Sequence, residues 1–153
     1  MAVPQALIDI ASRNAAELAA RYVALWNEPA ADRRRRMIAA LWTEDGRHIL
    51  QPPQEVREIA ARPGVAMAAI LEAAGHGEIA ARAASVHEHW VRSEGLTFRG
   101  RDDADRLGEV VKLHWEAVAK SDEVVAVGLS VLILAGDGRI DRDYTFIVAP
   151  ADA

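Results

Sequence analysis

Two side chains of this sequence are candidates for proton chemistry, Asp143 and Tyr22. An aspartate that faces an apolar interior is desolvated, so its pKa rises toward neutrality and it can act as a base. A tyrosine hydroxyl can donate a hydrogen bond to a substrate oxygen, although an inward tyrosine is more often part of a core. Alternatively, Asp143 pairs with Arg47, Arg99 or another basic side chain, or it is exposed because the register is shifted by one residue.

His87 is a further candidate, because histidine titrates near neutral pH. It lies at the edge of an apolar helical stripe, where a position on a pocket rim is the alternative. His87 and His89 are two residues apart and point in different directions along a helix, so they do not form a metal pair and no metal site is supported. The chain has no cysteine, which excludes disulfides and thiolate chemistry.

No Gly-rich phosphate loop and no Gly-x-Ser-x-Gly elbow occurs, which disfavours nucleotide-dependent and serine-hydrolase functions. We therefore expect no cofactor. The formal net charge of −5 disfavours nucleic acid, since the single basic run, residues 33–36, would encircle a helix. No stretch is long and apolar enough to span a membrane, so a cytoplasmic location is the default expectation.

The length and composition are those of one globular domain over residues 1–153, with 51% hydrophobic and 27% charged residues. The N-terminal half is predicted to be mainly helical, with a turn and a short strand between helices. The expected helices are Pro4–Asn27, Ala31–Trp42, Gln54–Ala74 with an interruption at Pro63-Gly64, and Gly77–Val91; the turn is Thr43–Gly46 and the short strand Arg47–Gln51.

The C-terminal half is rich in β-branched and aromatic residues and predicts extended segments. These are Leu96–Arg99, Glu109–Lys120, Glu123–Leu134 and Arg139–Ala149. Short turns at Ser121-Asp122 and 135–138 join the last three, which predicts antiparallel hairpins. Helices followed by a strand meander indicate an α+β fold.

This order of elements resembles the nuclear transport factor 2-like superfamily, and several local sequences resemble its SnoaL-like, polyketide cyclase-like branch. They are Arg21–Ala24 with Trp26-Asn27, Leu41–Gly46, Gly77–Arg82 and Gly136–Tyr144. The resemblance implies a cone, in which a curved antiparallel sheet wraps around the N-terminal helices and leaves an internal pocket. The segment 54–74 looks like an insertion in this comparison.

Within such a cone, alternate residues of each strand face the pocket. The expected inward residues are Val111, Leu113, Trp115 and Ala117 on the first long strand; Ala126, Gly128, Ser130 and Leu132 on the second; and Asp141, Asp143, Thr145 and Ile147 on the third. Lys112, His114 and Glu116 would lie on the outer face, together with an apolar patch of Val127, Leu129, Val131 and Ile133. A patch of this kind predicts a homodimer through the sheet.

The resemblance also disfavours one reaction of the superfamily. Tyr22 matches the tyrosine of the ketosteroid isomerases, but Gln51 stands at their base position and Ser130 at their acid position. A glutamine cannot abstract a proton. Arg142-Asp143-Tyr144 looks like the last-strand sequence of limonene epoxide hydrolases, whose partner Arg and second Asp have no evident counterpart here.

Two hypotheses remain. The first is a cofactor-independent isomerase, cyclase or dehydratase that acts on a hydrophobic, oxygenated substrate by proton transfer, with Asp143 as the base and Tyr22 as its partner. The substrate-binding side chains would be Gln51, Ser130, Trp115, His87, Trp26, Trp90 and Thr145. The second is a non-catalytic ligand-binding or dimerisation domain of the same fold, which the missing first-strand aspartate favours.

Overall fold

The computed structural model describes residues 4–51 and 72–148, and for residues 7–13 the backbone alone. The described helices are α1 (Gln5–Asn27), α2 (Ala31–Leu41) and α5 (Gly75–Val86), and a π-helical turn, η1 (His87–Arg92), continues α5. None of these helices is long and apolar enough to cross a membrane. The helices at Pro4–Asn27 and Ala31–Trp42 are thus confirmed, except that Trp42 already belongs to the first strand.

Seven strands form one mixed sheet in the order β2-β1-β7-β6-β5-β3, and β4 also pairs with β5. They are β1 (Trp42–Leu50), β2 (Glu72–Ala74), β3 (Thr97–Gly100), β4 (Asp105–Leu107), β5 (Val110–Val118), β6 (Val124–Leu134) and β7 (Ile140–Val148). The hairpins β5-β6 and β6-β7 are antiparallel as predicted. One pair differs from the expected antiparallel sheet, because β1 lies parallel to β7.

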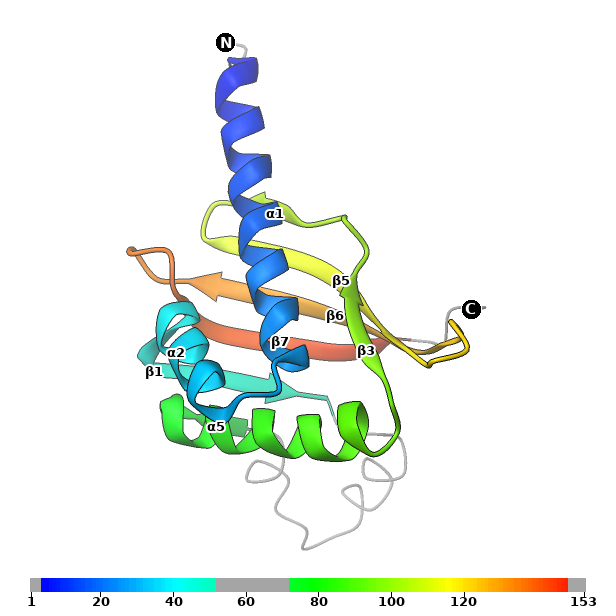
Figure 1. Cartoon of the computed structure of the whole chain (residues 1–153). Coiled ribbons are helices and arrows are strands. Elements are labelled where there is room, and N and C mark those ends of the chain that lie inside the picture. The colour runs from blue at the N-terminus through cyan, green and yellow to red at the C-terminus, as the bar shows by residue number, and fades with distance from the viewer. Residues whose placement is uncertain (1–3, 52–71, 149–153) are drawn as a thin grey trace, which may run out of the picture.

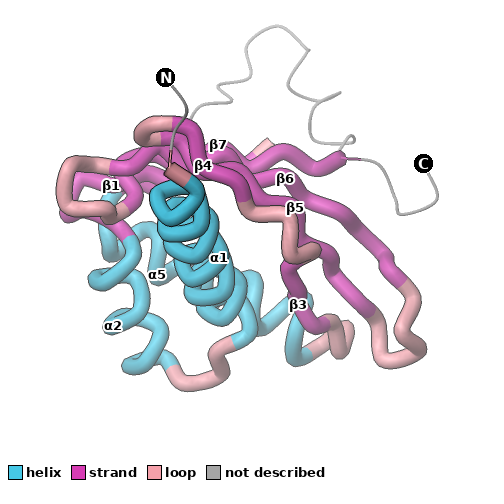
Figure 2. Tube along the Cα trace, turned by 90° about the horizontal axis from the view of Figure 1, so that it is seen from above, coloured by secondary structure: helices cyan, strands magenta, loops and turns pink. Residues whose placement is uncertain are grey.

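The sheet is curved, and α1, α2 and α5 lie on its concave side (Figures 1 and 2). The N-terminal part of α1 extends beyond the sheet, whereas its C-terminal half crosses the concave face (Figure 1). Buried side chains from both layers fill the space between them, among them Tyr22, Leu25, Ile79 and Leu132. The α+β cone expected from the sequence is the observed architecture.

The predicted turn at Thr43–Gly46 is wrong, because these residues are part of β1. The pairing of β1 with β7 shifts register between Trp42 and Arg47, so this stretch forms an irregularity within the strand. A Cβ atom on Gly46 would lie 2.8 Å from Cδ1 of Trp42 and 3.0 Å from the carbonyl oxygen of Ile140. The turn-forming sequence therefore serves a close backbone approach inside the sheet.

The predicted helix Gln54–Ala74 is wrong at its end, where Glu72–Ala74 forms β2 and pairs antiparallel with β1. Alanine favours helices, but strand pairing overrides this weak local preference. The remainder, residues 52–71, lies outside the described residues. The helix predicted at Gly77–Val91 begins two residues earlier and changes to π-helical geometry at His87.

The inward positions predicted for β5 and β6 are confirmed by the burial of Val111, Leu113 and Ser130. On β7 the alternation fails at its first residues, because a register shift opposite Leu134 places Ile140 in the core instead of Asp141. The Asp141 carboxylate is half-buried and accepts a hydrogen bond of 3.5 Å from the Thr43 hydroxyl.

The outer face of the sheet is less uniformly exposed than expected. Val127 is only 2% exposed and lies in register between Glu116 and Val148, so its inclusion in an exposed patch was wrong. Leu129, Val131 and Ile133 are half-buried. On β6 and β7 the most exposed apolar side chains are Val125, at 43%, and Phe146, at 45%.

Candidate functional site

Two adjoining cavities lie on the concave side of the sheet. The first, here called the inner chamber, has a volume of about 60 Å³ and is lined by Tyr22, Val23, Trp26, His48, Leu50, Val86, Phe98, Trp115 and Thr145. The second, here called the vestibule, has a volume of about 350 Å³ and is lined by Leu50, Gln51, Val86, Trp90, Leu96, Phe98, Trp115, Ala117, Val125, Ala126 and Ile147. Four residues line both cavities, so the small chamber adjoins the larger vestibule. They are Leu50, Val86, Phe98 and Trp115.

Asp143 lies behind the wall of the inner chamber and is completely buried. The Tyr22 hydroxyl donates to Oδ2 of its carboxylate at 2.6 Å, and the Thr145 hydroxyl donates to Oδ1 at 2.7 Å. Tyr22 and Thr145 themselves line the chamber. The carboxylate therefore reaches the chamber through two hydroxyl groups.

Ser130 completes a buried cluster of hydroxyl groups. Its Oγ lies 3.0 Å from the Tyr22 hydroxyl and 2.9 Å from Oγ1 of Thr145, and it accepts a hydrogen bond of 3.1 Å from Nε1 of Trp115. Since Tyr22 and Thr145 both donate to Asp143, the Ser130 proton remains for one of their oxygens. The hydrogen bonds thus run from Trp115 through Ser130 toward the Asp143 carboxylate.

Burial raises the pKa of Asp143 to about 7, although hydrogen bonds from Tyr22 and Thr145 and the charge of Arg82 act in the opposite direction. Burial, together with the neighbouring Asp143, also raises the pKa of Tyr22 well above its usual value. Tyr22 therefore keeps its proton at neutral pH, while Asp143 exchanges between its two protonation states. A group with this behaviour is suited to general acid–base chemistry.

His48 also lines the inner chamber, although no sequence pattern points to it. It lies on β1 directly in register with Asp143 on β7, and its Nε2 is 3.6 Å from Oδ2 of Asp143. Burial and the charge of Arg82 lower the pKa of His48 to about 3. His48 is consequently neutral at physiological pH, and the pair is not an ion pair.

A basic partner for Asp143 was the alternative prediction, and one basic side chain, His48, lies 3.6 Å from its carboxylate. Arg47 pairs with Glu72 at 2.8 Å, and Arg99 pairs with Glu116 at 2.9 Å and Asp122 at 3.4 Å. Neither arginine is therefore the partner of Asp143. The exposed alternative is wrong as well, because Asp143 is 0% exposed.

The other predicted binding residues are divided between the two cavities. Trp26 lines the inner chamber, and Trp90, which is 51% exposed, lines the vestibule. Gln51 also lines the vestibule, but its Oε1 already accepts a hydrogen bond of 2.9 Å from the backbone nitrogen of Ile147. His87 is on η1 and is not among the described residues that line either cavity.

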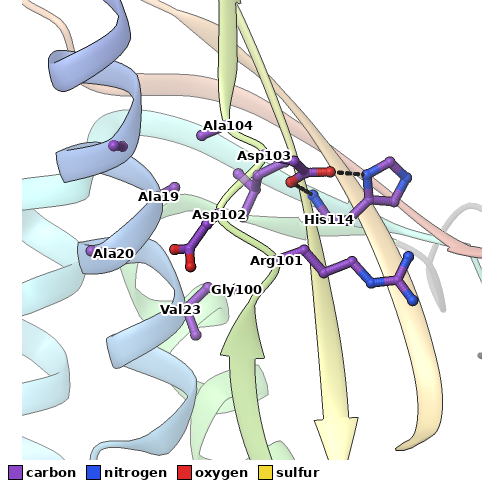
Figure 3. Close-up of a pocket in the computed structure, with 11 residues that line it drawn as sticks. Ala19, Ala20, Val23, Gly100, Arg101, Asp102, Asp103, Ala104 and His114 are labelled. Atoms are coloured by element: carbon purple, nitrogen blue, oxygen red, sulfur yellow. Dashed lines mark hydrogen bonds and ion pairs between the residues drawn. The ribbon is translucent and has the colours of Figure 1, made fainter.

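A third hollow lies on the flank of the molecule, between α1 and the segment that joins β3 to β4 (Figure 3). Its volume is about 400 Å³, and Asp102 points toward α1, whereas Arg101 and His114 point away from it. Nδ1 of His114 lies 2.5 Å from Oδ2 of Asp103. This placement confirms His114 on the outer face, and the hollow holds none of the predicted site residues.

Among the described residues, no group of three or more His, Asp or Glu side chains is placed so that it could hold a metal ion. The polar groups around the inner chamber are instead a carboxylate, three hydroxyls, an indole N–H and an imidazole. These groups can exchange or donate protons to a ligand.

No protein-family model matches the chain, and no curated protein matches it. Solved structures do. A proposed isomerase of the SnoaL-like family from Agrobacterium tumefaciens is 23% identical, with a TM-score of 0.70 over 90% of this chain and 99% of that one. A proposed polyketide cyclase from Sinorhizobium meliloti is 10% identical, with a TM-score of 0.54 over 84% and 93% of the two chains.

A third similar structure is SalBIII, an epoxide hydrolase/cyclase-like enzyme with a role in pyran ring formation in the polyether salinomycin. It is 16% identical, with a TM-score of 0.55 over 86% of this chain and 88% of that one. At these identities the likeness establishes a common architecture. The chain therefore has the ketosteroid isomerase-like α+β fold that SnoaL-like proteins share.

Proposed function

We propose that this protein binds a small hydrophobic, oxygenated molecule and catalyses a proton transfer on it without a cofactor, as an isomerase, cyclase or dehydratase. The observation that carries the proposal is the buried Asp143, with a pKa of about 7, hydrogen-bonded at 2.6 Å to a tyrosine that lines the inner chamber. A carboxyl group with a pKa near neutrality can both accept and return a proton.

The two cavities would hold different parts of the ligand. The inner chamber, at about 60 Å³, has room for a carbonyl or hydroxyl group, and its wall carries Tyr22, His48 and Thr145. The vestibule, at about 350 Å³, is lined mainly by apolar side chains, among them Trp90 and Trp115. Apolar walls with a few convergent polar groups are typical of small-molecule sites.

The proton would pass through Tyr22. A proton of the bound substrate moves to the Tyr22 oxygen while the Tyr22 proton moves to Oδ2 of Asp143, which lies 2.6 Å away. The reverse transfer returns the proton to another atom of the substrate, so the protein ends unchanged. The high pKa of Tyr22 favours such a concerted relay, because a free tyrosinate beside Asp143 is strongly disfavoured.

The test is exchange of carbon-bound hydrogens in D₂O. Two cyclic ketones, 2-cyclohexenone and 1-indanone, are incubated with the full chain, and loss of the α-proton signals is followed by ¹H NMR. We expect acceleration by the wild type and a loss of about 10²- to 10⁴-fold in Asp143→Asn, the usual contribution of a general base. Asp141→Asn, a half-buried aspartate on the same strand, is the matched control. Equal rates for Asp143→Asn and the wild type would contradict the proposal.

The second candidate function is a non-catalytic ligand-binding domain. It is favoured by the position of Asp143, which is not among the described residues that line either cavity. Native mass spectrometry of the freshly purified protein distinguishes the two. A co-purified small molecule without exchange activity on any ketone supports the binding domain, whereas exchange that depends on Asp143 supports the enzyme.

We also propose that the protein is a homodimer that associates through the outer face of the sheet and is located in the cytoplasm. The exposed side chains Val125 and Phe146 lie on the neighbouring strands β6 and β7, with half-buried Leu129 and Val131 near them. Burial of this apolar surface would stabilise the association.

A further inference from the structure

His48 and Arg82 form a buried contact that the proposed proton transfer does not use. Nη1 of Arg82 donates to Nδ1 of His48 at 3.0 Å and also to the His48 carbonyl oxygen at 2.9 Å. A guanidinium group has donors and no acceptor. Nδ1 of His48 must therefore be the acceptor, which leaves the only ring proton on Nε2 and makes the imidazole neutral.

The Nε2 side of the ring lies next to Asp143, and His48 itself lines the inner chamber. Nε2 lies 3.6 Å from Oδ2 of Asp143, the same oxygen that accepts the Tyr22 proton at 2.6 Å. His48 and Tyr22 both line the inner chamber, and His48 is only 3% exposed. The Tyr22 proton is thus donated to Asp143, whereas Nε2 of His48 is beyond hydrogen-bond distance of that carboxylate.

Titratable or charged groups from three elements lie near His48. They are Tyr22 on α1, Arg82 on α5 with Glu78 near it, and Asp143 on β7. The indole ring of Trp26 lies 5.1 Å from the imidazole, and that of Trp42 lies 6.5 Å from it, measured between centroids. The aromatic rings exclude water, while Arg82 opposes a second positive charge.

We propose that Arg82 is a positioning residue that holds His48 as the neutral Nε2–H tautomer, so that His48 donates a hydrogen bond to a ligand carbonyl oxygen in the inner chamber. The choice of ligand site rests on the proposed function, whereas the tautomer does not depend on turnover. His48 would bind a ketone or its enolate, because the negative charge that develops on the oxygen is stabilised by a preorganised donor. The lowered pKa of His48 agrees with this role, because the ring then carries a single proton at neutral pH and acts as an uncharged donor.

The tautomer is tested by long-range ¹H–¹⁵N NMR of the uniformly labelled full chain. The resonances of His48 are assigned by their loss in His48→Gln. We expect a protonated Nε2 and an unprotonated Nδ1 in the wild type, with no change between pH 5 and pH 8. Titration of His48 within this range, or a proton on Nδ1, would overturn the inference.

The role of Arg82 is tested by two substitutions. Arg82→Met removes the donor to Nδ1, so we expect His48 to show both tautomers and to titrate at a higher pH than in the wild type. Arg82→Lys keeps a charged donor and should preserve the Nε2–H form. Arg47→Met, which removes an arginine that is paired with Glu72 at the surface, is the matched control and should leave His48 unchanged. An unchanged spectrum in Arg82→Met would contradict the positioning role.

The ligand class is tested with 1-indanone carrying ¹³C in its carbonyl group. Saturable binding with a downfield shift of the carbonyl resonance is expected, and His48→Phe should weaken it about three- to tenfold, the loss typical of one neutral hydrogen bond. His48→Gln, which retains an N–H donor, should bind more tightly than His48→Phe and guards against a folding defect. Absence of saturable binding, or equal binding by all three proteins, would overturn the assignment of a carbonyl ligand.

These measurements are made at equilibrium, so their outcome is separate from that of the exchange experiment. Binding and the predicted tautomer without hydrogen exchange would refute the catalytic proposal and support the donor role of His48. Exchange that depends on Asp143, with His48 titrating between pH 5 and pH 8, would support the catalytic proposal and refute the donor role of His48.

Discussion

At the scale of single residues, burial acts in opposite ways on two neighbours. It raises the pKa of Asp143 to about 7 and lowers the pKa of His48 to about 3, because in each case it disfavours the charged form. Both groups can therefore be uncharged in a slightly acidic solution. The two side chains lie in register on β1 and β7, so this strand pair brings them together.

The first prediction concerns stability and pH. A raised pKa means that Asp143 stabilises the fold below pH 4 and that this contribution is lost as the pH rises to about 7. A lowered pKa means that His48 contributes stability above its ordinary value of 6.5, which is lost as the pH falls toward about 3. Each effect is on the order of 4 kcal/mol at 1.36 kcal/mol per pKa unit. Between about pH 4 and pH 6.5 the two opposite changes in the free energy of unfolding with pH should largely cancel.

Substitution of one group should reveal the pH dependence of stability that the other group causes. In His48→Gln, the free energy of unfolding should fall as the pH rises from 4 to 7, and in Asp143→Asn it should fall as the pH decreases from 6.5 to 3. Urea unfolding at a series of pH values measures both, with Asp141→Asn as the control that should follow the wild type. A free energy independent of pH in His48→Gln would show that Asp143 is not perturbed as described.

A second prediction concerns the hydrogen bond between Tyr22 and Asp143. This bond lowers the pKa of Asp143, so Tyr22→Phe should raise that pKa above about 7. Titration of the aspartate carboxyl carbons by ¹³C NMR measures the change. Tyr144→Phe is the control, because Tyr144 is one residue from Asp143 on β7 and points to the opposite face of the sheet. A pKa that stays the same or falls in Tyr22→Phe would count against the assigned hydrogen bond.

At the scale of elements, the contact between β5 and β6 shapes both cavities. Trp115 lies in register with Gly128, and a Cβ atom on this glycine would lie 2.0 Å from Cζ2 of Trp115. The indole can therefore lie against the sheet, where its Nε1 donates to Ser130. Because Trp115 lines both the inner chamber and the vestibule, this glycine helps to set the boundary between them.

The third prediction is that Gly128→Ala displaces the indole of Trp115. The displacement should break the hydrogen bond to Ser130 and lower stability by about 1–3 kcal/mol, as is usual for overpacking. Thermal unfolding and the fluorescence of the Trp115 indole measure the two effects. Gly136→Ala is the control, since a Cβ atom there would meet nothing within 4 Å. Equal stability of both variants would contradict the proposed contact.

At the scale of the whole molecule, the curved sheet separates two surfaces with different roles. Its concave side covers the inner chamber and the vestibule, and its outer side carries the exposed apolar side chains. The outer side also carries charged pairs at one end, where Glu116 accepts hydrogen bonds from Arg99 at 2.9 Å and Arg101 at 3.2 Å. An interface centred on β6 and β7 would leave these pairs at its rim.

The fourth prediction concerns the oligomeric state. We expect a dimer at micromolar concentration in sedimentation equilibrium, and a monomer for Phe146→Lys, because a buried lysine without a partner destabilises an apolar interface. Leu107→Lys is the control, since Leu107 is 84% exposed and lies on β4, which pairs with β5 and with neither β6 nor β7. A wild-type monomer, or a dimer unaffected by Phe146→Lys, would exclude association through this face.

The sequence by itself determined the helices α1 and α2, the long strands β5, β6 and β7, and the side of them that faces inward. Strand alternation placed Trp115, Ser130, Asp143 and Thr145 on one face, and helical periodicity placed Tyr22 opposite them, as observed. These predictions succeed because the period of two in strands and of 3.6 in helices is a local property of the chain. The alternation failed only where a register shift interrupts it, at Ile140 and Asp141.

Only the tertiary structure decided the surroundings of His48. Its contact with Arg82 joins β1 to α5, and its position beside Asp143 requires that β1 pair in parallel with β7, almost a hundred residues further along the chain. No local pattern encodes such a pairing, since it depends on how the layers pack. The same holds for the pKa values of Asp143 and His48, because burial that no local sequence specifies determines both.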